Sequence, residues 1–131
     1  MKTIRFLTML TLLGAAFQFA SAQSSAVSNE IAAALSAGDV NKLGVHFNSS
    51  IELVVDSKSD VYSKQQAIGI LSDFFRKNPV KGFQNLHSGN KDASNFMIGT
   101  LKTATGNFRV YLVIRKTEGK LLIQQLRIEA E

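Results

Sequence analysis

The sequence predicts an α+β domain in which three N-terminal helices pack on a curved, mainly antiparallel sheet. Two periodicities and a set of turn signals support this prediction. Between residues 23 and 79 most apolar residues recur with the spacing of helices, whereas from Val80 onward they alternate as in strands with one buried face. Three turn signals divide the second half, so we expect it to form a four-stranded antiparallel meander.

Residues 1–22 have the parts of a secretory signal peptide. A short basic region is followed by an apolar run, and Ala20-Ser21-Ala22 is a small-residue cleavage site. The apolar run is shorter than the roughly 20 residues that a membrane-spanning helix needs, so we expect cleavage before Gln23 and no membrane anchor. The sequence therefore predicts an exported protein, periplasmic or extracellular, with one domain over residues 23–131.

Composition narrows the classes of function. The chain has no cysteine, which excludes disulfides, thiolate metal ligands and a cysteine nucleophile. Its formal net charge is +5, and the basic residues fall singly or in pairs such as Arg76-Lys77 and Arg115-Lys116. A nucleic-acid binder clusters basic residues with aromatic partners, so we expect no nucleic-acid partner.

A Gly-Asp pair separates the first two predicted helices. The first helix has an apolar stripe that begins at Val27 and ends before Gly38, a residue suited to the position after a helix. Asp39 is the expected N-cap of a short second helix, whose buried face comprises Val40, Leu43 and Phe47. The Asn-Ser-Ser segment that follows is expected to end this second helix.

The third helix has the clearest signals in the chain. Before it, residues 51–55 predict a strand and Val61-Tyr62 a second short one. Ser63 and Gln66 have the spacing of a capping box. Apolar residues then recur at helical spacing until Asn78-Pro79, where the residue before proline avoids the helical conformation.

Four strands are expected over about 81–88, 94–103, 107–116 and 120–129. One face of the third and fourth strands is apolar and is expected to receive the helices; it comprises Phe108, Val110, Leu112, Ile114, Leu122, Leu126 and Ile128. The opposite face is mostly charged but includes an apolar patch, which we expect to form a homodimer contact. This patch comprises Tyr111, Val113, Leu121 and Ile123.

This order of elements resembles the nuclear transport factor 2-like superfamily. The segment Ala33–Leu43 is similar to the helix–Gly-Asp–helix opening of that superfamily, and the likeness covers about Ser25 to Glu129. Together with the signal peptide, it resembles small secreted bacterial proteins classed as domains of unknown function. The superfamily implies a cone-shaped cavity between sheet and helices. Its members include dehydratases, ketosteroid isomerases and non-catalytic binding or dimerisation modules.

Three polar residues are candidates for a site in the cone. His87 has the parity of Phe83, so it is an acid or base candidate if that face lines the cone, and a rim or surface residue otherwise. Gln124 has the parity of Leu126 and is expected to point at the helices, where it binds a ligand or satisfies protein groups. His46 is either a general base or a packed, edge-exposed histidine.

The sequence leaves three hypotheses for function. The first is a non-catalytic exported domain that binds a small apolar ligand or a partner and forms a homodimer. The second is a small lyase or isomerase that uses His87, with Gln124 positioning the substrate, and the third is a structural or inhibitory module that acts through its surface. The sequence contains no phosphate loop, dinucleotide fingerprint or nucleophile elbow, and two histidines are too few to argue for a metal site. We therefore expect no cofactor and no metal.

Overall fold

The computed structural model describes residues 25–131, and the signal peptide predicted over residues 1–22 lies outside the described residues. The described chain begins in a helix that runs to residue 37. The remaining elements follow in the order α2 (Val40–Gly44), β1 (Phe47–Val55), β2 (Lys58–Ser63), α3 (Lys64–Lys77), β3 (Val80–Lys91), β4 (Ser94–Thr103), β5 (Gly106–Thr117) and β6 (Lys120–Ala130).

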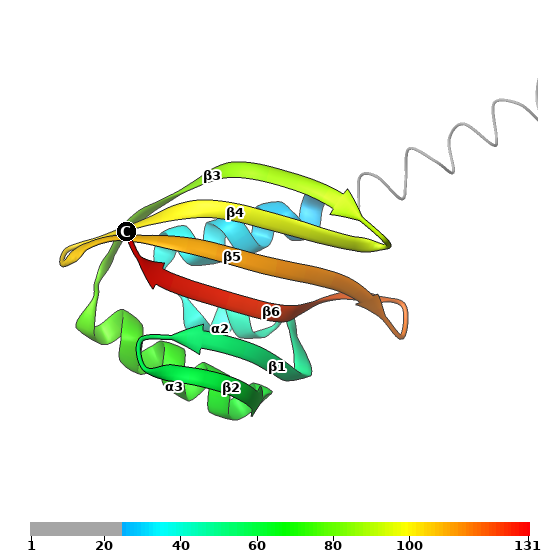
Figure 1. The fold of residues 1–131 in the computed structure, drawn as a ribbon, viewed down its shortest axis with the longest axis horizontal. Helices are drawn as coiled ribbons and strands as arrows, with labels where there is room; N and C mark the ends of the chain where they lie inside the picture. Colours follow the sequence, from blue (N-terminus) through cyan, green and yellow to red (C-terminus); the bar gives the residue numbers. More distant parts are fainter. Residues whose placement is uncertain (1–24) are drawn as a thin grey trace, which may run out of the picture.

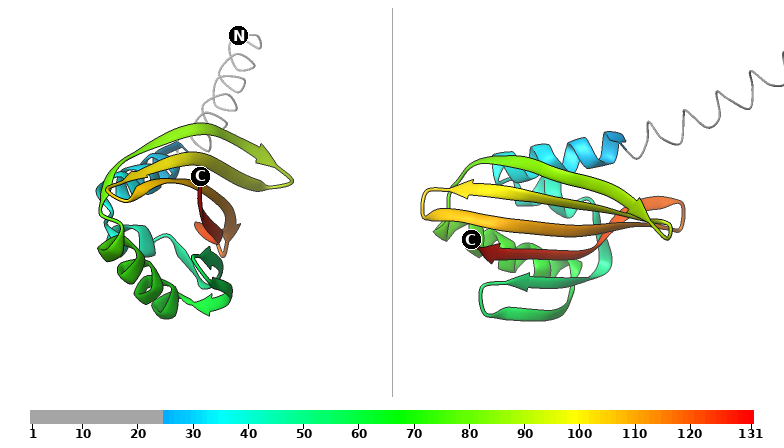
Figure 2. Two further views of the ribbon diagram at one scale, coloured as in Figure 1. Left: turned by 60° about the vertical axis from the view of Figure 1, so that its left-hand side comes forward. Right: turned by 45° about the horizontal axis from the view of Figure 1, so that its top comes forward.

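All six strands form one sheet in the order β2-β1-β6-β5-β4-β3 (Figure 1). Neighbouring strands are antiparallel except β1 and β6, which run parallel. The sheet curves around the helices, which lie on its concave side (Figure 2). The α+β class and the meander β3 to β6 are thus confirmed. The sheet is wider than the meander because β1 and β2 form a hairpin that joins it along β6.

The junction between the first helix and α2 forms as its sequence predicts. Gly38 has a φ of +63°, the left-handed conformation that favours glycine. The Asp39 carboxylate accepts a hydrogen bond from the Lys42 backbone N–H at 3.1 Å, as an N-cap does.

The second helix is shorter than predicted. It ends at Gly44, and Phe47, predicted to lie on its buried face, is the first residue of β1. Phe47 pairs with Ile123 of β6, and the Ile123 N–H donates to the His46 carbonyl at 2.6 Å. Pairing with β6 therefore decides the conformation here, and β1 begins four residues before the predicted strand.

The third helix has the predicted capping box. The Ser63 hydroxyl accepts from the Gln66 N–H, the Gln66 side chain accepts from the Ser63 N–H, and both distances are 3.2 Å. The helix ends at Lys77, where the Asn78 N–H donates to the Phe74 carbonyl at 2.9 Å. The capping box at Ser63 and the cap at Asn78 thus confirm the predicted start and end of the third helix.

Apolar side chains fill the concave side of the sheet. Phe74 of α3 packs edge-on against Phe108 of β5, with ring centroids 5.0 Å apart. The largest of the fully buried side chains are Phe47, Phe74, Ile31, Leu35, Leu43, Ile51, Leu53, Leu71, Met97, Leu101, Leu112 and Ile114.

A bulge in β6 reverses the predicted alternation of side chains. Val113 pairs with Gln125 but Ile114 pairs with Ile123, so Gln124 is an extra residue in its strand. A bulge of this kind moves every side chain beyond it to the opposite face.

The prediction of an outward-facing patch is therefore wrong for two of its four residues. Ile123 is fully buried, and Leu121 packs against the core. Leu122 was predicted to face the helices. It lies beyond the bulge, where it pairs with Arg115, and its side chain is on the face opposite to that of Leu121 and Ile123. Tyr111 and Val113 remain on the outer face of the sheet, since their neighbours Val110 and Leu112 are fully buried.

Candidate functional site

A cleft of about 520 Å³ lies between α3 and the β1–β2 hairpin. Its helical wall consists of residues at the spacings that place side chains on one side of a helix. The lining residues are Val55, Asp56, Ser57, Lys58 and Tyr62 from the hairpin, and Gln66, Gly69, Ile70, Asp73, Phe74 and Lys77 from α3. The cleft thus combines an apolar lining with charged groups, and it was not predicted from the sequence.

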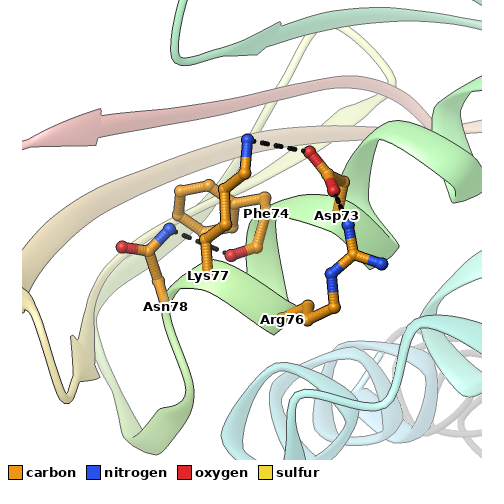
Figure 3. Close-up of polar contacts among 5 residues, drawn as sticks. All are labelled: Asp73, Phe74, Arg76, Lys77 and Asn78. Carbon is orange, nitrogen blue, oxygen red and sulfur yellow. Dashed lines mark hydrogen bonds and ion pairs between the residues drawn. The ribbon is translucent and has the colours of Figure 1, made fainter.

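Asp73 is held between two cations at this wall (Figure 3). The Lys77 ammonium lies 3.0 Å from its carboxylate, and the Arg76 guanidinium donates a hydrogen bond to the same group. The hydrogen bond from Lys77 is the main cause that lowers the pKa of Asp73 below its ordinary value of 3.8. Asp73 is therefore ionised at neutral pH and is poorly suited to be a general acid.

His46 lines a second groove, of about 370 Å³, between the first helix and α2. Its Nε2 lies 3.2 Å from the Glu30 carboxylate, and its side chain is 13% exposed. The apolar lining includes Ala33, Ala37 and the exposed Val45. His46 therefore has the packed, edge-exposed position that was one of its two alternatives.

His87 lies on β3, the edge strand of the sheet, and is exposed to solvent. A bulge between Asn85 and His87 pairs His87 with Ile98, so it does not share the face of Phe83 as predicted. Its ring centroid is 5.5 Å from that of Phe96. His87 lines neither of the two grooves. The structure thus places it at the surface, the alternative to a position in the cone.

Gln124 uses both ends of its amide within the protein. Its Oε1 accepts from Asn48 Nδ2 at 3.1 Å, and its Nε2 donates to Thr117 Oγ1 at 2.9 Å. Because these bonds tie the bulge of β6 to β1 and β5, they support a structural role for Gln124. It does not lie beside His87, since β5 and β4 separate their two strands.

Four partly exposed apolar side chains form a strip on the outer face of the sheet, which we call the outer strip. It consists of Phe96 and Ile98 of β4 with Val113 and Tyr111 of β5, paired across the two strands. Sequence reasoning identified the β5 residues but missed those of β4. The sequence contains a signal for them, since Phe96, Met97 and Ile98 are consecutive apolar residues and must therefore place apolar side chains on both faces of the sheet.

The charge pairs beside the outer strip contain both signs. Arg109 and Glu131 lie 3.0 Å apart, and Arg127 and Glu129 lie 3.4 Å apart. Arg127 pairs with Tyr111 across β5 and β6, which places it directly beside the strip.

Residues 25–131 contain neither a metal-ligand cluster nor a membrane-spanning helix. No group of three or more histidine, aspartate or glutamate side chains there could hold a metal ion. No helix in the same residues is long and apolar enough to cross a membrane.

A family model described as a domain of unknown function, DUF4783, matches residues 28–129. The chain belongs to the DUF4783 family. A DUF4783 protein from Bacteroides ovatus is 36% identical with a TM-score of 0.75, covering 78% of this chain and 93% of its own. Another from Bacteroides fragilis is 37% identical with a TM-score of 0.74, covering 78% and 96%.

More distant similarity shows that this DUF4783 protein has the fold of nuclear transport factor 2-like proteins, which its sequence resembles. A candidate dehydratase of the NTF2-like family from Streptomyces avermitilis has a TM-score of 0.58 at 11% identity, covering 83% of this chain and 94% of its own. At this identity the likeness shows the fold alone. No curated protein matches the sequence.

Proposed function

We propose that this DUF4783 protein is a non-catalytic exported binding domain that forms a homodimer through its outer strip. The main support is that four apolar side chains are partly exposed on the outer face of β4 and β5. The side chains on the inner face of the same strands are buried in the core. Contiguous exposed apolar groups of this kind favour association with another surface.

The charges beside the strip favour a second copy as the partner. A two-fold contact brings the same surface patch of both subunits together, so each charge can meet its opposite on the other subunit. Arg127 and Glu129 lie on one strand beside Tyr111 and can exchange partners in this way.

Sedimentation of the protein at high micromolar concentration tests the dimer. We expect a dimer for the wild type and a monomer for Val113→Lys, which places a charge in the strip. Val61→Lys is the matched control, because Val61 is a strand valine that is 62% exposed and lies on β2, the opposite edge of the sheet from β3. A monomeric wild type removes the proposal, and a dimer that survives Val113→Lys removes this interface.

Export is proposed from the signal peptide pattern of residues 1–22. The expected mature protein begins at Gln23 and is recovered outside the cytoplasm. Mass spectrometry of the protein from fractionated cells tests this, and a full-length mass in the cytoplasmic fraction contradicts it.

The enzymatic alternative, a lyase or isomerase based on His87, has less support. A general acid or base must reach the proton it transfers within a bound substrate. The imidazole of His87 is exposed and lines neither of the two grooves described above. We therefore favour binding over catalysis.

A further inference from the structure

We propose that the homodimer contact of the outer strip extends across the sheet to His87, and that protonation of His87 separates the two subunits. This inference rests on the homodimer proposed above and adds regulation by pH to it. Three observations support it: the position of His87 on the outer face, the small size of the outer strip, and the distribution of charge on β3 and β4.

His87 lies on the same face of the sheet as the outer strip. It pairs with Ile98, which pairs in turn with Tyr111, and Tyr111 pairs with Arg127 of β6. Residues that pair across neighbouring strands have their side chains on one face, so these four residues form one row across the outer face. The His87 ring also lies beside that of Phe96, with centroids 5.5 Å apart. The histidine therefore borders the outer strip directly.

The outer strip is too small to hold a stable dimer by itself. It has four residues on two strands, whereas a stable contact buries about 800 Å² and includes about 20 to 30 residues on each partner. A face-to-face dimer centred on the strip must therefore also cover the flanking strands β3 and β6. His87 and Arg127 are the members of the row on those two strands. The imidazole, which is exposed in the single subunit, thus loses contact with water in the dimer.

The two-fold axis brings both copies of His87 to the same edge of the contact. Exchange of ion-pair partners between Arg127 and Glu129 requires β6 to lie against its own copy. An arrangement in which both the outer strip and β6 meet their own copies also places β3 against its copy, because the strand order is the same in the two subunits. Protonation therefore adds two like charges at one edge of the interface.

The strands around His87 have no carboxylate to balance this charge. Within residues 80–91 and 94–103, which form β3 and its neighbour β4, there is no aspartate or glutamate. Their other charged residues are Lys81, Lys91 and Lys102. Of the carboxylates that approach these strands, Asp92 lies in the turn after β3. Glu131 accepts a hydrogen bond from Thr100 Oγ1 but is already paired with Arg109 at 3.0 Å.

Acid therefore opposes association. Burial disfavours the charged form of an imidazole, and so does a nearby like charge. His87 takes up a proton more readily in the separated subunit, so the dimer is favoured at pH 8. It is weakened as the pH falls through the range near 6.5 in which histidine titrates.

Sedimentation equilibrium at pH 8 and pH 5.5 tests this regulation. We expect the dissociation constant of the wild type to rise about tenfold or more at pH 5.5, where carboxyl groups remain ionised. The chain has two histidines, so His46→Gln is the matched control and should keep the wild-type ratio of the two constants. In His87→Gln the ratio should be close to one. Circular dichroism at both pH values checks that each protein is folded.

A permanent charge at the same position gives a second test. His87→Lys carries its charge at both pH values, so it should dimerise more weakly than His87→Gln at pH 8. Val61→Lys adds the same charge on β2 and should dimerise as the wild type does.

The outcomes separate this inference from the dimer itself. A monomeric wild type at pH 8 overturns the homodimer and the regulation with it. A dimer with the same dissociation constant at pH 8 and pH 5.5 overturns the regulation alone. A pH dependence that persists in His87→Gln, or disappears in His46→Gln, overturns the role of His87.

Discussion

The two sides of α3 differ in how completely the fold covers them. One side packs into the core, where Ala67 and Leu71 are fully buried and Phe75 is nearly so. The other side faces the cleft, where Gly69 is exposed and Ile70 is only partly buried. A helix of this length needs one apolar side to be held in a domain. The cleft side adds the buried Phe74 and the partly exposed Ile70, so it is covered less completely than the packed side.

Two helical glycines show the same contrast. A Cβ at Gly44 of α2 would lie 2.6 Å from the Ile68 Cδ1 atom of α3, so the Ile68 side chain would have to move if residue 44 carried a Cβ. A Cβ at Gly69 would meet nothing within 4 Å. The same residue type therefore serves packing at one position and leaves open space at the other.

The largest expected effect is on the packed side. Leu71→Ala should lower the free energy of unfolding by about 2–5 kcal/mol, because it removes a fully buried side chain and leaves a cavity. Ile70→Ala, one position away on the cleft side, should cost about 1 kcal/mol, since only part of that side chain is buried. Urea denaturation of the two variants measures the difference. Equal losses would contradict the distinction between the two sides.

Gly44→Ala should destabilise the protein by about 1 kcal/mol. Overpacking costs about 1–3 kcal/mol, and the better helix propensity of alanine returns about 1 kcal/mol of this. Denaturation midpoints measure the change. Ile68→Ala removes both the Cδ1 and the Cγ1 atoms that the new methyl group would meet, so the cost of Gly44→Ala should disappear when it is measured in the Ile68→Ala background, if the clash is the cause.

Gly69→Ala should have the opposite sign. It is expected to stabilise the protein by about 0.5–1 kcal/mol, because alanine favours the helix and its Cβ meets no neighbour. Thermal denaturation measures the gain. A loss of stability would show that α3 requires glycine at this position for a reason other than the open cleft.

The sequence predicts elements whose signals are local. The capping box of Ser63 and Gln66 and the N-cap at Asp39 are each set by residues within one helical turn, and both are confirmed. The start of β1 was missed because Phe47 joins the sheet through pairing with Ile123, which lies far away in the sequence. Local periodicity carries no information about such a partner.

The candidate site was harder to predict because two bulges change the faces of side chains. The extra residues Leu86 of β3 and Gln124 of β6 shift the register, so alternation counted along the sequence assigns the wrong face beyond them. His87, Leu121 and Ile123 were misplaced for this reason. The cleft could not be derived, since it depends on where the β1–β2 hairpin lies relative to α3.

The smallest expected effect concerns Asp73 on the cleft side of α3. Its pKa is lowered in the folded protein, chiefly by the hydrogen bond from Lys77. A carboxyl group with a lowered pKa contributes stability above its unfolded pKa, and this contribution is lost as the pH falls through the folded pKa. Asp73→Asn should therefore lower the denaturation midpoint slightly at pH 7. The difference from the wild type should disappear in acid, below the ordinary value of 3.8.

Salt separates this electrostatic contribution from a packing effect. Asp73 and both of its cationic partners are substantially exposed, so concentrated salt screens their interaction. The difference between wild type and Asp73→Asn at pH 7 should shrink in 1 M salt, a concentration at which the screening length is about 3 Å. A difference that persists in acid and in salt would mean that the effect of Asp73→Asn does not arise from the charge of the carboxylate.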